Sequence, residues 1–145
     1  MDVGSSFLPS EIIAAFLWAQ LENLDDIQHV RKLHWEQYNI ALQNWALENE
    51  IQLPVIPSYA TNNGHMFYLV CKNLAQRTAI IAKLKNKDIL SVFHYISLHS
   101  SPFYNQSQQE QSLPQSDRYS DCLLRLPMYY ELDVDNLINN VIDED

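Results

Sequence analysis

Apolar residues in the first part of the chain recur at helical spacings. Segment 11–24 follows Pro9, which suits a first helical turn because proline has no backbone N–H to leave unpaired there. The apolar residues of the segment spread over most of the helical circumference, so we expect neighbours to cover this helix on more than one side. They are Ile12, Ile13, Phe16, Leu17, Trp18, Leu21 and Leu24.

The pattern changes between Asp25 and Glu48. Apolar residues now recur three and four positions apart, with charged and amide side chains between them, which predicts a long amphipathic helix with one core face. The residues expected on that face are Ile27, Val30, His34, Tyr38, Ala41, Leu42 and Trp45.

The second part of the chain alternates between short apolar runs and helical patterns. Prolines at 54 and 57 end the long helix, and the turn-prone stretch 61–64 precedes the apolar run that follows. The pattern predicts strands at 65–71 and 89–96, helices at 73–89 and 133–145, a polar loop near 100–117, and a short helix that ends before Pro127.

Together these elements predict an α+β fold in which long N-terminal helices pack on a small sheet with flanking helices. We expect one domain over 1–145, with helices in 1–50 leading into a small αβ domain at 51–145 that carries the polar loop. The two predicted strands could pair in parallel or through a later segment, and the pattern leaves that choice open.

Composition narrows the possible functions. With only 2 glycines the chain has no glycine-rich phosphate loop, and its net charge of −9 disfavours nucleic acid as a partner. Polar residues interrupt the apolar N-terminal stretch, so we expect neither a signal peptide nor contact with a membrane. Cys71 and Cys122 form no CxxC motif, and we interpret them as reduced core thiols of a cytoplasmic protein.

Candidate chemistry centres on "VFHYISLHSSPFY", residues 92–104, where two histidines follow an apolar run. His94 and His99 are five residues apart, so they do not share a face of a regular element, and no third ligand stands at a metal-binding spacing. No serine or cysteine lies in a nucleophile motif. The paired carboxylates stand at predicted helix starts, where capping is the simpler interpretation. We therefore expect no metal site and no catalytic residue in this chain.

Four stretches resemble one family throughout the chain, in the expected order and spacing: "SFLPSEIIAAFLWAQLE", "NNGHMFYL", "VFHYISLH" and "LLRLPMYY". They are similar to the DegT/DnrJ/EryC1/StrS sugar-nucleotide aminotransferases, fold-type I enzymes that use pyridoxal phosphate (PLP). The resemblance weakens only across 100–119. Family members are more than twice as long, so the chain is expected to correspond to their C-terminal small domain and the helix leading into it, with Met1 falling at an interior family position.

The resemblance implies positions for several side chains. The segment "FHYISLH" would approach the mouth of the family's active site, where its side chains would orient a sugar or a diphosphate. For His65 and Tyr95 the alternative is that they satisfy buried hydrogen bonds. Ser97 stands where the family usually has proline, which implies a looser turn before His99. The implied substrate-binding residues are His94, Tyr95, His99 and His65, and the residues near the cofactor are Ser5 and Ser6.

The resemblance also implies a function and its limits. The intact enzyme would transfer an amino group onto a 4-keto-6-deoxy sugar nucleotide for cell-surface polysaccharide synthesis. None of the five lysines stands in the family's PLP-binding motif, so we expect no PLP on this chain alone and no activity. The alternatives are a freestanding interaction module, which self-associates or pairs with a full-length aminotransferase, and the remnant of a truncated gene. We expect a homo-oligomer formed through Phe16, Leu17 or Trp18 of the apolar first helix.

Overall fold

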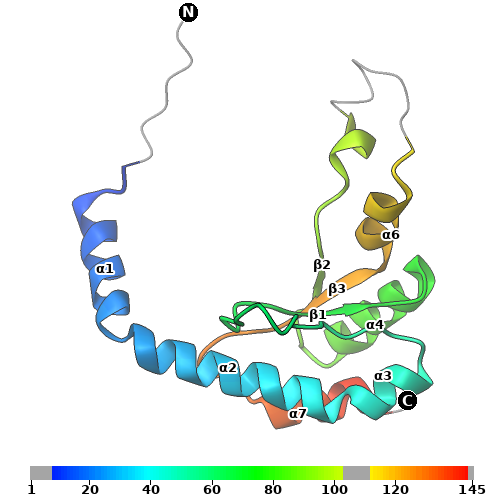
Figure 1. Ribbon diagram of the computed structural model, residues 1–145, viewed down its shortest axis with the longest axis horizontal. Helices are drawn as coiled ribbons and strands as arrows, with labels where there is room; N and C mark the ends of the chain where they lie inside the picture. Colours follow the sequence, from blue (N-terminus) through cyan, green and yellow to red (C-terminus); the bar gives the residue numbers. More distant parts are fainter. Residues whose placement is uncertain (1–7, 103–111, 144–145) are drawn as a thin grey trace, which may run out of the picture.

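The computed structural model describes residues 8–102 and 112–143, and it confirms the α+β fold (Figure 1). The helices are α1 (Glu11–Glu22), α2 (Leu24–Ala41), α3 (Gln43–Glu48), α4 (Leu74–Asn86), α6 (Pro114–Cys122) and α7 (Val134–Ile142), with a 3₁₀ turn η1 (Leu98–Ser100). The strands are β1 (Phe67–Val70), β2 (Val92–Phe93) and β3 (Leu123–Leu126).

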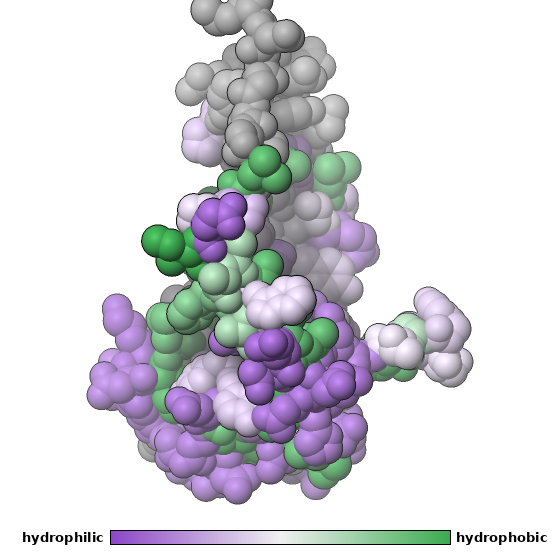
Figure 2. Space-filling model, turned by 90° about the vertical axis from the view of Figure 1, so that its left-hand side faces the viewer, coloured by the Kyte–Doolittle hydropathy of each residue, from purple (hydrophilic) through white to green (hydrophobic). Residues whose placement is uncertain are grey.

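Helix α1 extends away from the rest of the molecule at one end of α2 (Figure 1). Ser10 caps its N-terminus, where the Ser10 hydroxyl oxygen accepts a hydrogen bond from the Ile13 backbone N–H at 3.4 Å. No residue of α1 is buried, although its side chains are largely apolar. In Figure 2, where the side of the molecule that carries α1 faces the viewer, hydrophobic residues are prominent on this helix. The cover that the sequence predicts for α1 is therefore not supplied by the described part of this chain.

The long helix predicted from Asp25 to Glu48 is two helices that meet at Leu42. Leu42 caps the end of α2 and the start of α3, and its side chain is fully buried. The core face also differs from the prediction, because Trp35 and Ala46 are buried whereas Ala41 is exposed. The buried residues Trp35, Tyr38, Leu42 and Ala46 are three, four and four positions apart, so they keep one helical face, which is displaced around the helix from the predicted one.

The sheet has the order β1-β3-β2, and both outer strands run antiparallel to β3. The two predicted strands therefore do not pair with each other, because β3 lies between them. The predicted short helix before Pro127 is wrong in its second half: the helix ends at Cys122 and the chain continues as β3. Side chains of β3 alternate between half-buried and buried, which is a strand period that four residues are too few to reveal in sequence.

One face of the sheet forms the core. Phe67 of β1 is fully buried, and its ring lies 5.4 Å from the ring of Trp35 and 5.0 Å from that of Tyr38, measured between centroids. Leu69, Leu124 and Leu126 share this face with Phe67. The opposite face carries Tyr68, Arg125 and Val92 in register across the three strands, and all three are only half-buried.

Several boundaries in the second half also differ from the predictions. The predicted strand at 89–96 is reduced to the two residues of β2. The polar loop predicted near 100–117 overlaps η1 at its start and α6 at its end, since α6 begins at Pro114. Proline suits that first helical position because its missing N–H would have no intrahelical partner there. Residues 103–111 of the loop lie outside the described residues.

The turn before β1 is held against α2 by Arg31. Its Nε donates to the carbonyl of Gly64 at 3.2 Å, and its second guanidinium nitrogen donates to the carbonyl of His65 at 2.6 Å. Gly64 has a φ of +61°, and a Cβ there would lie 2.8 Å from the carbonyl oxygen of Arg31. Only glycine fits this close approach, and the turn delivers His65 to the open face of the sheet.

Candidate functional site

A groove of about 410 Å³ lies along the half-buried face of the sheet. It contains two of the predicted site residues, His65 and His94, together with Arg125 of β3. The rest of the described lining is apolar: Met66, Leu90, Val92, Leu126, Pro127 and Met128. A groove with apolar walls and a few convergent polar groups is the usual form of a small-molecule site.

The two histidines enter the groove from different elements. His94 follows β2 directly, and its ring meets that of Tyr95 edge-on, with 4.9 Å between centroids. Its Nδ1 is buried and has no hydrogen-bond partner among the described residues. His65 is exposed at the start of the strand segment, and its Nδ1 lies 3.0 Å from the side-chain oxygen of Asn63.

Tyr95 and His99 do not line this groove in the part of the chain that the structure describes. The Tyr95 side chain is 75% exposed, and its backbone carbonyl accepts a hydrogen bond from the hydroxyl of Ser120 at 3.4 Å. His99 is buried in η1, where its Nε2 lies 2.7 Å from a carboxylate oxygen of Asp117 in α6. The buried contact of His99 connects η1 to α6.

The predicted alternative for His65 and Tyr95 was a buried hydrogen bond, and the structure contradicts it because neither side chain is buried. Ser5 and Ser6 lie outside the described residues. Ser97 has a φ of −56°, which is a value that proline adopts, and its hydroxyl donates to the carbonyl of Ser116 at 3.2 Å. The turn before His99 therefore keeps a proline-like backbone and is hydrogen-bonded to α6.

Arg125 is the groove residue that the sequence analysis missed. It falls within the run that was interpreted as the end of a helix, where an arginine is expected to face solvent. The four residues of "LLRL" are too few to signal a strand by themselves, and only in the strand does Arg125 face away from Leu124 and Leu126.

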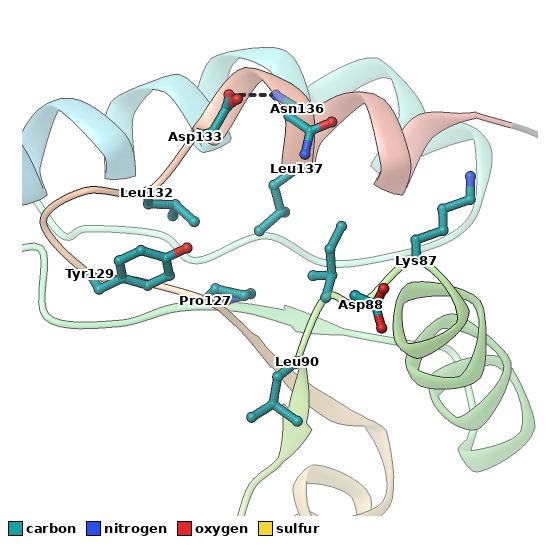
Figure 3. A pocket seen from close by; sticks show the side chains of 10 residues that line it. Lys87, Asp88, Leu90, Pro127, Tyr129, Leu132, Asp133, Asn136 and Leu137 are labelled. Atoms are coloured by element: carbon teal, nitrogen blue, oxygen red, sulfur yellow. Dashed lines mark hydrogen bonds between the residues drawn. The ribbon is translucent and has the colours of Figure 1, made fainter.

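A second hollow, of about 510 Å³, lies between the end of α4 and the start of α7 (Figure 3). Leu132 and Leu137 line one side of it, and Leu90 and Pro127 are shared with the histidine groove. Asp133 at its rim accepts a hydrogen bond from the backbone N–H of Asn136, as the N-cap of α7 (Figure 3). It contains none of the predicted site residues, and the Asp133 carboxylate at its rim caps a helix.

Metal and membrane criteria can be applied to the same part of the chain. Among the described residues, no three or more His, Cys, Asp or Glu side chains are grouped so that they could hold a metal ion. Within residues 8–102 and 112–143, no helix is both long and apolar enough to cross a bilayer.

The architecture defines a class of protein. An antiparallel three-stranded sheet, with α2, α4 and α7 among its neighbouring helices, matches solved fold-type I aminotransferases. The chain belongs to the DegT/DnrJ/EryC1/StrS aminotransferase family, whose model matches residues 2–144.

Solved structures of related proteins support this assignment. S. venezuelae DesV, in complex with a ketimine intermediate, is 26% identical with a TM-score of 0.76, and the match covers 88% of this chain and 34% of that one. Helicobacter pylori PseC, an aminotransferase involved in the biosynthesis of pseudoaminic acid, is 18% identical with a TM-score of 0.79, and the match covers 97% of this chain and 38% of that one. The PLP form of the sugar aminotransferase Spr1654 from Streptococcus pneumoniae is 20% identical with a TM-score of 0.74, and the match covers 86% of this chain and 33% of that one.

The chain thus spans about a third of the length of these structures, and the described lining of the groove of His65 and His94 includes no lysine that could hold PLP. A PLP-binding lysine has to be positioned within the site. None of the five lysines lines the groove of His65 and His94. Lys72 pairs with Glu50 at 3.0 Å on the surface, and Lys83 donates to backbone carbonyls at the end of α7. We therefore derive no chemical step through PLP on this chain.

Proposed function

We propose that the chain is the C-terminal small-domain portion of a PLP-dependent aminotransferase that acts on a 4-keto-6-deoxy sugar nucleotide. The observation that carries the proposal is the family match over residues 2–144, on a chain that covers only 33 to 38% of the related structures described above. In this proposal a large domain supplies PLP, its lysine and the chemistry, and the chain alone is inactive.

In the complete enzyme, the groove of His65 and His94 would lie at the mouth of the active site. Tyr95 is exposed beside His94 and is available to contact a sugar nucleotide there. His99 would act indirectly, since it is buried against Asp117 and supports the segment that carries Tyr95. We keep Ser5 and Ser6 as residues near the cofactor, on the family resemblance alone.

We infer the particular substrate from the sequence motifs. "SFLPSEIIAAFLWAQLE" and "LLRLPMYY" are similar to the dTDP-4-amino-4,6-dideoxygalactose transaminases of common-antigen and O-antigen synthesis. The amino donor would be glutamate, and the reaction would take place in the cytoplasm.

The proposal is tested by adding PLP to the purified chain, alone and with the separately expressed large domain of a family relative. Alone, the chain should show no visible absorbance of lysine-bound PLP and no transfer of the glutamate amino group to a dTDP-4-keto-6-deoxy sugar. The pair should transfer it faster than the large domain alone. A borohydride-reducible PLP adduct on one lysine of the isolated chain, with turnover, would overturn the inactivity.

A second candidate function is supported by α1. Phe16 is 72% exposed and Trp18 is 67% exposed, on a helix without a buried residue. Contiguous exposed apolar surface of this kind marks protein–protein contact sites. As a freestanding module, the chain would pair through α1 with a second copy or with a full-length aminotransferase.

A further inference from the structure

The groove of His65 and His94 has an unusual charge composition for this protein. The chain has 18 acidic and 9 basic residues, yet the described lining of the groove contains one arginine, two histidines and no acidic residue. A cationic group among apolar walls attracts anions, because the low dielectric surroundings screen its charge less than water does.

Arg125 differs from the other arginines in its contacts. Arg31, Arg77 and Arg118 each donate at least one hydrogen bond, to the carbonyls of Gly64 and Ser120 and to the side chain of Gln52 respectively. Arg125 has no hydrogen-bond or ion-pair partner among the described residues, and its Nε is buried. Buried donors are nearly always paired in folded proteins, so the unpaired Nε of Arg125 in a groove indicates a missing acceptor.

His94 lies on the same face of the sheet as Arg125. Val92 is the register partner of Arg125, and His94 follows it by two residues, which returns the side chain to the same face. Its Nδ1 is the other unpaired buried nitrogen in the groove. Two residues with an unpaired buried nitrogen, Arg125 of β3 and His94 just after β2, thus line the same groove as His65.

We propose that Arg125 and His94 bind a phosphate group, with His65 at the rim, and that Leu90, Val92 and Met128 contact the less polar part of the same ligand. A tetrahedral phosphate offers acceptor oxygens in several directions, which suits donors that arrive from three segments of chain, and arginine binds phosphate in a bidentate manner. The identity of the ligand rests on the proposed function. In that case the ligand would be the diphosphate group of the sugar nucleotide.

Inorganic diphosphate is the probe, because its binding requires neither PLP nor turnover. Titration of ¹⁵N-labelled chain should shift the Arg125 Nε resonance and the imidazole nitrogens of His94 and His65, in a saturable manner. Arg125→Gln should weaken the affinity at least tenfold, whereas Arg125→Lys should retain part of it. Arg118→Gln, which removes the same charge from an exposed arginine, should leave the affinity unchanged.

The inference would be overturned if these nitrogens showed no saturable shift in the wild-type chain, or if both glutamine variants weakened the affinity equally. It would also be overturned if the chain bound an acidic peptide in preference to diphosphate, because the acceptor would then be a protein carboxylate. The wild-type titration decides the matter even if Arg125→Gln fails to fold. Diphosphate binding without amino transfer by the two-domain pair would uphold this site and reject the proposed function. Amino transfer by the two-domain pair without diphosphate binding would support the proposed function and reject this phosphate site.

Discussion

Buried polar side chains show how individual residues stabilise this fold. Tyr38 is fully buried in α2, and its hydroxyl donates to the carbonyl of Pro127 at 3.0 Å. This bond satisfies both groups at the point where the chain leaves β3. Burial, with a smaller contribution from Tyr129, raises the pKa of Tyr38 well above its ordinary value, since the charged phenolate would lose its hydration.

Cys71 provides a measurable consequence of the same effect. Its backbone N–H donates to the carbonyl of Cys122 at 2.9 Å, where the end of β1 lies beside the start of β3, and both thiols are buried and free. Burial, and then the neighbouring Cys122 thiol, raises the pKa of Cys71 from 9.0 to about 11, although Arg77 opposes the shift.

We expect the free energy of unfolding to fall between pH 9 and pH 11. The unfolded chain releases the Cys71 proton near its ordinary pKa, whereas the folded chain retains it to about 11. The contribution of this thiol is therefore complete below pH 9 and is lost as the pH rises to 11, by roughly 3 kcal/mol at most. Urea unfolding under reducing conditions across this range measures the loss.

Cys71→Ala is the matched variant for this prediction. It lacks the thiol, so it should lose less stability than the wild type between pH 9 and pH 11, whatever its stability at pH 7. Tyr38 contributes to both proteins above pH 10 and cancels in the comparison. An equal pH dependence in the two proteins would show that Cys71 is not responsible.

At the scale of elements, α3 and α4 end in the same way without glycine. After α4, the Asp88 N–H donates to the carbonyl of Lys85 and the Ile89 N–H to the carbonyl of Leu84, which is a Schellman motif. After α3, Glu50 and Ile51 make the equivalent bonds to Leu47 and Ala46. Asp88 and Glu50 take the left-handed position, with φ of 57° and 56°, where glycine is favoured.

Asp88→Gly should therefore stabilise the protein. Glycine adopts the left-handed conformation without the steric cost that an L-residue pays there, and we expect a gain of about 1 kcal/mol in the free energy of unfolding. Chemical denaturation at pH 7 measures the change.

Gly64→Ala is the opposite test at a left-handed position. The added Cβ would lie 2.8 Å from a backbone oxygen of α2, so this variant should lose about 2 kcal/mol or more. A loss of stability in Asp88→Gly would show that the aspartate side chain contributes more than its backbone conformation costs.

At the scale of the molecule, the most exposed feature is α1. The helix lies away from the core that α2, α7 and the sheet share (Figure 1), and its apolar side chains are exposed, as Figure 2 shows on the face turned to the viewer. Covering such a helix removes apolar surface from water, which is the main favourable contribution to association. A second copy of the chain is the simplest partner in a purified sample.

We expect the purified chain to self-associate through α1, and Phe16→Glu to weaken the association by roughly tenfold or more, because a charge would be buried in the contact. Sedimentation velocity over a concentration series measures the effect. Ile40→Glu on α2 is the matched control, since Ile40 and Phe16 are each 72% exposed. A monomeric wild type at every concentration, or equal effects of the two substitutions, would contradict self-association through α1.

Local pattern determined much of this protein. The helical spacing around Tyr38 and the apolar run 65–71 that contains β1 depend on short-range sterics and side-chain periodicity, which can be read from neighbouring residues. The start of α1 was displaced by two residues, because Ser10 caps the helix and Pro9 lies before it. The family resemblance was likewise carried by short motifs, and the match over 2–144 confirmed the family.

Only the tertiary structure decided where the site lies. Leu123–Leu126 becomes a strand because β1 and β2 pair with it on both sides, and these pairings join residues far apart in sequence. That pairing brings Arg125 into the groove that His94 also lines, whereas His99 is buried against Asp117 of α6. Local periodicity contains no information about which distant segment satisfies a strand's backbone hydrogen bonds, and the sheet that brings His65, His94 and Arg125 together is built from those bonds.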